Sequence, residues 1–429
     1  MMKTLLKGGR VINPATNTDA VMDLLVEDGK VTQWAEKIQE EADEVIDATG
    51  KWVVPGFIDV HVHLREPGFE YKETIRTGSQ AAVMGGFTTI CCMPNTEPVV
   101  DNEIMVEYIK LKADREGACH VLPIGAITKG QKGEELANIG QMVKAGACGI
   151  SEDGKSVMNA GLLKTAMKYS KMFDIPVMSH CEDKSLVAGG VMNAGEQSTL
   201  LGLKGISNDS EDVMIARDII LARATGAKLH LCHVSTKGGI DLIRDAKSHG
   251  QEVSAEICPH HFTLSDRDVL DYDANTKMNP PLRSMDDVLA LRQALKDDVV
   301  NIIATDHAPH SEDEKNCEYE KAAFGIVGLE TAFTLGYTVL VKGDWLTPMQ
   351  LVAKMSTNPA KLLGIEKGDI SVGKAADITV IDPEKEYVID AKNFASMGKN
   401  TPFDGWRVQG KVEYTLVDGK MKVKEGVLQ

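Results

Sequence analysis

Eight short apolar runs recur between residues 55 and 304, and this repetition constrains the fold more than any other feature of the sequence. Helix-length stretches separate most of the runs, and those at 104–113, 162–172, 213–224 and 288–295 carry apolar residues at helical spacing. Strands that alternate with helices predict an α/β fold, here a parallel (β/α)8 barrel of the TIM type. The predicted strands are 55–60, 87–93, 121–127, 147–150, 175–178, 228–232, 253–258 and 299–304.

The two ends of the chain have a different texture, with short β-type runs broken by glycine. Near the start such runs occur at 24–26 and 53–54, and near the end at 376–381, 406–412 and 414–417. Residues 36–44 are the one stretch there that could form a helix. Because chain termini often lie close together, we predict that residues 1–53 and 366–429 form one small β-sandwich domain and residues 54–365 the barrel.

Composition excludes several classes of protein. The formal net charge of -16 argues against nucleic-acid binding, and an anionic substrate would need local cations. The first residues are too polar for a signal peptide or a membrane span, so we predict a cytoplasmic protein without membrane contacts. Eight cysteines in such a chain are expected to be reduced and buried. They form no CxxC pair, and we assign none to a metal.

Polar groups that can bind metals or hydrogen-bond follow most of the predicted strands. In a barrel the carboxyl ends of the strands share one rim, where active sites lie. His61 and His63 are one residue apart, so both project to the same face of a strand. The remaining candidate ligands on the rim are Asp153, His180, His233 and Asp306.

Six candidate ligands exceed what one tetrahedral zinc ion needs, so we predict two Zn²⁺ ions with Asp153 as a bridge. A bridging hydroxide would be the nucleophile, and the second metal would polarise the scissile carbonyl. Asp306 would act as general base toward the hydroxide and as general acid toward the leaving amide nitrogen. Two alternatives stay open. Asp153 could be an acidic loop residue that binds no metal, or the site could hold one zinc ion tightly and a second one weakly.

The residues around these ligands resemble the signatures of dihydroorotases, which are cyclic amidohydrolases of the amidohydrolase superfamily. The first signature is GFIDVHVHLREPG at residues 56–68, and the second is ATDHAPH at residues 304–310. The resemblance spans nearly the whole chain. It includes MPNT at 93–96, HVST at 233–236, CPHH at 258–261, NPPLR at 279–283 and GKAAD at 373–377.

The resemblance implies reversible, zinc-dependent cyclisation of N-carbamoyl-L-aspartate to (S)-dihydroorotate, in pyrimidine (UMP) biosynthesis. It implies the same six metal ligands, with Asp306 catalytic. It also implies a set of substrate contacts, in which Arg65 would hold a carboxylate through its planar fork. These contacts are His63, Arg65, Asn95, Asn279, His310, Phe324 and Gly325.

One departure from the family concerns the fourth strand. Many relatives bridge their metals there with a carboxylated lysine, whereas a subset of dihydroorotases uses an aspartate. We therefore assign Asp153 and leave Lys155 outside the metal shell. His260 and His261 lie on the rim, and their role stays open between support of the ligands and a structural function.

Three other functions agree with parts of this pattern. Hydantoinases, dihydropyrimidinases and allantoinases share the chemistry, but Arg65 and His310 have no obvious partner in a neutral ring. A catalytically silent partner subunit would lack ligands, and every expected ligand is present. A phosphate-binding barrel would carry a glycine-rich loop where residues 309–314 are acidic instead.

Beyond the small-molecule substrate, a homodimer is the expected assembly. Association with other pyrimidine-pathway enzymes stays open. The segment 311–321 is charged and poor in apolar residues, so we hypothesise that it is mobile and orders over the substrate.

Overall fold

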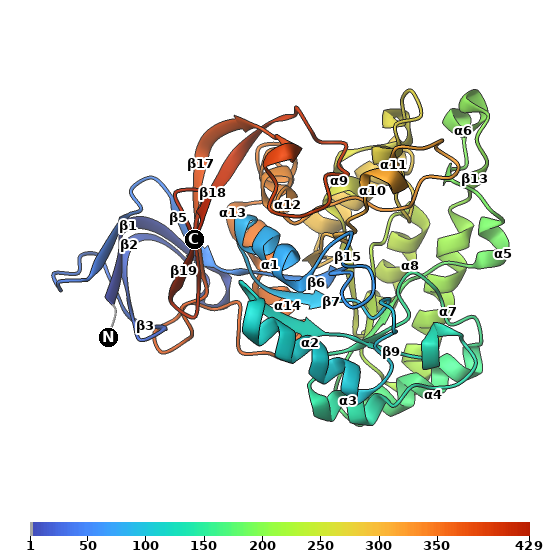
Figure 1. Ribbon diagram of the computed structural model, residues 1–429, viewed down its shortest axis with the longest axis horizontal. Helices are drawn as coiled ribbons and strands as arrows, with labels where there is room; N and C mark the ends of the chain where they lie inside the picture. Colours follow the sequence, from blue (N-terminus) through green and yellow to red (C-terminus); the bar gives the residue numbers. More distant parts are fainter. Residues whose placement is uncertain (1–2) are drawn as a thin grey trace.

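The structure is a computed structural model, and it describes residues 3–429. Its strands alternate with helices around a closed barrel, beside which a sheet built from both ends of the chain is packed (Figure 1). Within these residues no helix is both long enough and apolar enough to cross a bilayer. The predicted barrel and the predicted terminal β-domain are both confirmed.

All eight predicted apolar runs contribute strands to the barrel. In chain order these are β6 (Phe57–Val62), β7 (Phe87–Cys92), β8 (His120–Pro123) with β9 (Gly125–Ala126), β10 (Ile150–Ser151), β11 (Val177–Ser179), β14 (Leu229–Leu231), β15 (Val253–Ile257) and β16 (Ile302–Ile303). Neighbouring strands pair in parallel. A parallel bridge between Val62 and His307 joins the first strand to the end of the last and closes the ring.

Helices surround the strands and bury them on the outside, which explains why the strands are apolar on both faces. The principal helices are α1 (Ile75–Met84), α2 (Glu103–Glu116), α3 (Ile139–Ala145), α4 (Ala160–Lys171), α7 (Asp209–Thr225), α8 (Lys237–Ser248), α10 (Met285–Lys296), α13 (Pro348–Met355) and α14 (Thr357–Leu363). Side-chain caps start several of them. For example, Thr74 and Thr77 form a reciprocal capping box at α1.

The loops at the rim carry shorter elements. These are α5 (Lys184–Val187), β12 (Met192–Asn193), α6 (Glu196–Leu201), β13 (Gly205–Ile206), α9 (Pro259–Thr263) and α11 (Glu312–Lys315). Helix α12 (Ala332–Leu335) lies elsewhere, where its Phe333 stacks on Phe57 at the start of β6. Inside the ring, Val60, Cys91, Met178 and Ile302 belong to one buried cluster. Because its members come from strands all around a closed barrel, this cluster must fill the interior.

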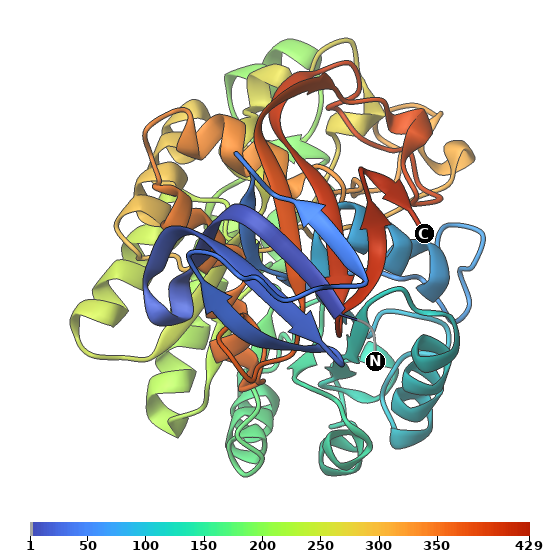
Figure 2. The ribbon, with the colours of Figure 1, turned by 90° about the vertical axis from the view of Figure 1, so that its left-hand side faces the viewer.

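The terminal sheet places the strands from the two ends of the chain side by side (Figure 2). Strands β1 (Lys3–Asn13), β2 (Thr18–Glu27), β3 (Lys30–Ala35), β4 (Glu44–Asp47) and β5 (Trp52–Pro55) precede the barrel. Strands β17 (Ile378–Val388), β18 (Arg407–Val417), β19 (Lys420–Lys424) and β20 (Val427–Leu428) follow it. The junction is the antiparallel pairing of β5 with β17. Apolar side chains of both ends, such as Leu24 and Leu416, share one core.

Three details differ from the sequence-based predictions. The segment 36–44 contains no helix; Ile38 packs on Leu5 and Leu25, and the Asp23 carboxylate accepts the Ile38 N–H at 2.8 Å. The runs 406–412 and 414–417 form one strand, because a bulge accommodates Glu413. All eight cysteines are free, but Cys317 is exposed and Cys148 partly so.

Candidate active site

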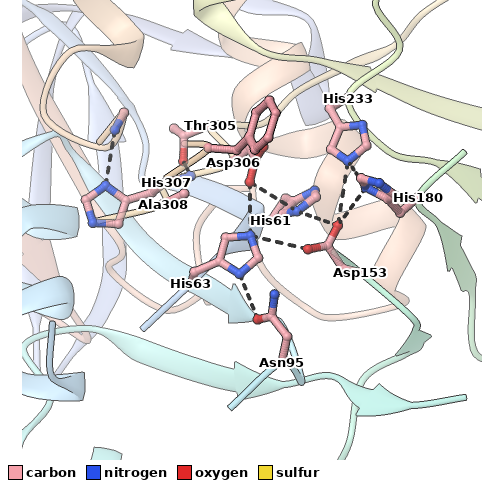
Figure 3. Close-up of polar contacts among 12 residues, drawn as sticks. His61, His63, Asn95, Asp153, His180, His233, Thr305, Asp306, His307 and Ala308 are labelled. Carbon is pink, nitrogen blue, oxygen red and sulfur yellow. Dashed lines mark hydrogen bonds and ion pairs between the residues drawn. The ribbon is translucent and has the colours of Figure 1, made fainter. Parts of the chain in front are cut away.

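The six predicted metal ligands converge at the carboxyl ends of five barrel strands (Figure 3). Each is almost completely buried. They come from strand β6 and from the residues that directly follow β6, β10, β11, β14 and β16. In chain order the residues are His61, His63, Asp153, His180, His233 and Asp306.

Asp153 lies at the centre of this group. Its Oδ1 atom is 3.5 Å from His180 Nδ1 and 3.6 Å from His233 Nε2. The same oxygen is 3.3 Å from His61 Nε2, whereas Oδ2 is 3.3 Å from His63 Nε2. Asp153 therefore lies next to all four imidazoles of the group, and its bridging role stays a prediction.

Asp306 closes the other side of the group. Its Oδ1 atom is 3.0 Å from His63 Nε2 and 3.4 Å from His61 Nε2. The backbone φ angle is 48° at Asp306 and 34° at His233, which is the left-handed region that non-glycine residues rarely adopt. Such strained residues concentrate at functional sites, where the surrounding structure holds them in place.

Hydrogen bonds behind the ligands fix which imidazole nitrogen faces the group. His61 Nδ1 donates to the Glu256 carboxylate at 2.6 Å, and His63 Nδ1 donates to Asn95 Oδ1 at 2.9 Å. Both Nε2 atoms are therefore left with free lone pairs. His230 Nε2 donates to the second oxygen of Glu256 at 2.8 Å. This carboxylate–histidine arrangement is typical of metal sites.

The electrostatics of the group require positive charge. Burial lowers the pKa of His61, but Asp153, Glu256 and Asp306 together raise it well above its ordinary value. Burial raises the pKa of Asp306, yet the neighbouring His61 and His63 hold it below its ordinary value. Buried carboxylates of this kind need protons or cations to balance them.

The residues present fit a metal centre. Among residues 3–429, three buried atoms of the group have no hydrogen-bond partner: His61 Nε2, Asp153 Oδ1 and His180 Nε2. Imidazole nitrogens and carboxylate oxygens are ligands that zinc and similar ions prefer. His61, His63 and Asp153 form one compact set of donors, and Asp153, His180 and His233 form another. The group therefore has the buried His/Asp clusters typical of a binuclear metal site.

A cavity of about 220 Å³ opens onto this group. The predicted substrate contacts all line it, together with five of the six predicted ligands. His61 lies outside the lining and is fully buried. The predicted contacts are His63, Arg65, Asn95, Asn279, His310, Phe324 and Gly325.

The Arg65 guanidinium is anchored at one edge of this cavity. Its Nε donates to the carbonyl of Pro309 at 3.1 Å, and its Nη2 lies 3.3 Å from His310 Nε2. The His310 Nε2–H in turn donates to the Phe324 carbonyl at 2.9 Å. Across the cavity, the Asn279 amide donates to Glu182 at 2.8 Å. A cation and several neutral hydrogen-bonding groups therefore surround one small space.

Two residues next to the predicted set are separate from the cavity. His261 Nε2 donates to the carbonyl of Pro280 at 2.9 Å, and burial lowers the pKa of its neighbour His260 to about 4. Neither is among the residues that line the cavity. Lys155, which we left outside the predicted metal shell, donates from its Nζ to the carbonyl of Gln131 at 3.3 Å.

Sequence reasoning missed Glu256 and Glu182. Glu256 sits within the apolar run 253–258, and a charged residue inside a buried strand is a signal that could have revealed it. Glu182 lies two residues after His180, and its Oε2 is 3.8 Å from His180 Nε2. Its position in a polar loop gave no comparable signal.

The fold and this set of donors define a class: metal-dependent amidohydrolases built on a (β/α)8 barrel with an appended β-domain. The Dihydro-orotase-like family model matches residues 50–239, and the Amidohydrolase family model matches residues 283–423. The L-hydantoinase of Arthrobacter aurescens superposes with a TM-score of 0.90 at 27% identity, over 100% of this chain and 98% of its own.

Sequence similarity identifies the family within this class. The dihydroorotase of Acetivibrio thermocellus is 54% identical over 424 residues, covering 99% of this chain and 100% of the relative. The dihydroorotase of Pelotomaculum thermopropionicum is 53% identical over 428 residues, covering 100% of both chains. This chain belongs to the dihydroorotase family.

Proposed function

We propose that this chain is an enzyme that interconverts (S)-dihydroorotate and N-carbamoyl-L-aspartate, in the synthesis of pyrimidine nucleotides. The observation that carries the proposal is Arg65, a half-buried cation that lines the same small cavity as the His and Asp donors. Identity above 50% to dihydroorotases over the full chain supports the same substrate.

The substrate carries a carboxylate beside its ring, and Arg65 is suited to hold it. One edge of the guanidinium is fixed by the Pro309 carbonyl, so the remaining N–H groups are free for a planar anion. Asn95 and His310 supply further hydrogen bonds near Arg65. Asn279 and the backbone of Phe324 and Gly325, which lies next to His310, are suited to the ring amides.

Hydantoinase, dihydropyrimidinase or allantoinase activity is the alternative, and the structural likeness to L-hydantoinase shows how closely related the barrels are. Arg65 favours dihydroorotate over these neutral rings, because its half-buried guanidinium can pair with the substrate carboxylate and has no anionic partner in a neutral ring. A catalytically silent role is disfavoured, since every expected ligand is present at the rim.

Two Zn²⁺ ions are the proposed cofactors, with one tight and one weaker ion as the alternative. His61, His63, Asp153 and Asp306 would hold one ion, and Asp153, His180 and His233 the other. When bound, the ions would polarise the ring carbonyl and lower the pKa of the attacking water.

Asp306 is the proposed proton carrier. A carboxylate oxygen of Asp306 takes a proton from the attacking water and delivers it to the ring nitrogen. The carbonyl carbon gains a bond to oxygen and loses its bond to that nitrogen, which yields the carboxylate and the carbamoyl group of the product.

The test is steady-state hydrolysis of dihydroorotate, dihydrouracil, hydantoin and allantoin on zinc-loaded protein of measured metal content. We expect a strong preference for dihydroorotate. Arg65→Met should lower kcat/KM for dihydroorotate by about 100-fold, because charged hydrogen bonds are lost, and leave metal content unchanged. Arg76→Met, at an exposed arginine on α1, is the matched control. Preference for a neutral ring would overturn the substrate assignment and leave the metal chemistry standing.

We further propose a cytoplasmic homodimer that binds neither nucleic acid nor membranes. The net charge of -16 supports the lack of nucleic-acid binding. Size-exclusion chromatography with light scattering would test the dimer, and a monomeric mass would contradict it.

A further inference from the structure

The loop between β17 and β18 leaves the terminal sheet and reaches the barrel (Figure 1). Residues 395–400 of this loop are held firmly against the rim. Ser396 Oγ donates to the buried Glu73 carboxylate at 2.5 Å, and the backbone N–H groups of Ala395 and Ser396 donate to Glu330 at 3.0 and 3.1 Å. At Gly398 a Cβ atom would lie 2.7 Å from Pro309 Cβ, so the backbone packs closely on the segment after β16.

Asn400 ends this segment, and its side chain is 5% exposed. Its Oδ1 accepts the backbone N–H of His310 at 3.1 Å. Its Nδ2 donates to the carbonyls of Ala308 at 3.0 Å and Gly325 at 3.1 Å. The Asn400 carbonyl also accepts the N–H of Val327 at 2.9 Å. One buried amide thus uses both ends of its side chain to join two separate segments of the rim.

Both segments form the wall of the cavity. Ala308 and His310 line it from one segment, and Phe324 and Gly325 line it from the other. The two segments touch at Gly325, whose φ is 127° and where a Cβ atom would lie 2.7 Å from Ala308 Cβ. A backbone bridge between His307 and Ile326 also joins the segments, and Asn400 is a buried side chain from outside both segments that bonds to each of them.

We propose that Asn400 is a positioning residue for substrate binding, which rests on the function proposed above. By fixing the backbone at His310 and Gly325 it sets the distance between the groups that hold the carboxylate and those that hold the ring. The terminal β-domain thereby contributes to specificity, although it supplies none of the six candidate metal ligands. Disturbing Asn400 should weaken substrate binding and leave the metal group intact.

Asn400→Asp is the sharpest test, because it keeps the shape and the acceptor but places an oxygen against two carbonyls. We expect KM for dihydroorotate to rise about tenfold, which corresponds to the loss of one or two hydrogen bonds. We expect kcat to change less than about threefold, and zinc content to stay at the wild-type value. Asn393→Asp is the matched control, since Asn393 lies in the same loop and is exposed.

A cycle with His310→Ala tests whether the effect passes through the cavity wall. The increase in KM caused by Asn400→Asp should be smaller in the His310→Ala background, whereas full additivity would overturn the proposal. An unchanged KM, or a lower thermal midpoint with unchanged kinetics, would overturn it too. If the Asp variant does not fold, Asn400→Ser provides the same comparison. If wild type and Asn393→Asp both fail to hydrolyse dihydroorotate, the proposed function itself is wrong, and this inference falls with it.

Discussion

Glu256 shows how one buried carboxylate can control two histidines. It accepts hydrogen bonds from His61 and His230, and its Oε1 also accepts the backbone N–H of His233 at 3.2 Å. Burial raises its pKa, but the neighbouring His61 and His230 bring the net pKa down to about 2. Glu256 therefore stays ionised and keeps the His61 Nε2 lone pair directed at the metal group.

We predict that Glu256→Gln weakens metal binding about 10- to 100-fold, the usual cost of losing such a partner. The Gln side chain has one acceptor oxygen where Glu256 offers two, so it cannot accept from both His61 and His230, and one imidazole loses its fixed orientation. Zinc retained after dialysis against graded chelator, measured by atomic absorption, is the readout. Glu252→Gln, at an exposed position before the same strand, should behave as wild type. Equal zinc retention in both variants would contradict this role.

Glu330 is a second single residue with a marked effect, because its contribution to stability depends on pH. Burial raises its pKa to about 7, although the N–H groups of Ala395 and Ser396 act in the opposite direction. The folded protein therefore binds a proton at Glu330 that the unfolded chain has already released above pH 4.5. Stability contributed by this group is fully present at low pH and is lost as pH rises toward 7.

The corresponding prediction concerns Glu330→Gln, which keeps an acceptor for the loop and cannot ionise. At pH 8 the variant should have a higher thermal midpoint than wild type, and at pH 5 the two should agree. Differential scanning calorimetry at both pH values measures this, with the exposed Glu134→Gln as control. A difference that is the same at pH 5 and pH 8 would rule out titration of Glu330 as the cause.

Residues close to the strand ends were predictable from sequence, and those brought from elsewhere were not. His61, His63, His180 and His233 stand in or directly after apolar runs, so the barrel geometry gathers them on one rim. Asn400 comes from a loop of the terminal domain, and no periodicity relates it to residues 308 and 325. Its role depends on tertiary packing alone.

At the scale of elements, the loop 311–321 is more tightly attached than its composition indicates. Lys315 Nζ donates to the carbonyls of Ala323 at 2.8 Å and Gly325 at 3.0 Å. Lys277 Nζ donates to the carbonyls of Tyr319 at 2.7 Å and Glu320 at 2.9 Å, and lies 4.4 Å from the centre of the Phe324 ring. Two buried lysines thus connect a charged loop to the cavity wall.

We still predict that substrate orders this loop. The reason is that Phe324 and Gly325 would contact the substrate and also contact the two lysines that hold the loop. A glutamate-specific protease should cut the loop more slowly when dihydroorotate is present, as followed by mass spectrometry. Lys315→Met should speed the cleavage in the absence of substrate, whereas Lys321→Met, at an exposed lysine, should not. Equal cleavage with and without substrate would count against a closing role.

Element boundaries were less predictable than element types. The run 299–304 yields only the two-residue strand β16, because its first residues still belong to the bend that follows α10. The run 121–127 is split into β8 and β9 around Ile124, which belongs to the interior cluster. An apolar run in the sequence indicates buried residues, and the buried segment is longer than the part that pairs with a neighbouring strand.

At the scale of the whole molecule, the metal group joins five strands, so metal should stabilise the entire barrel. Removing it leaves buried carboxylates without compensating charge. We predict that chelation lowers the thermal midpoint by several degrees and that added Zn²⁺ restores it; a thousandfold excess of ligand over Kd contributes about 4 kcal/mol. Asp153→Ala should lose most of this response. An unchanged midpoint after complete removal of metal would contradict the prediction.

The pairing of β5 with β17 has a consequence for the order of events during synthesis. Strands β1–β5 leave the ribosome first and can pair with one another, but β17, which pairs with the other edge of β5, emerges only after the whole barrel has been made. Until then β5 presents an unpaired edge, the kind of surface that invites association between nascent chains. A chaperone that shields this edge would favour correct assembly, and premature termination before β17 would leave it permanently open.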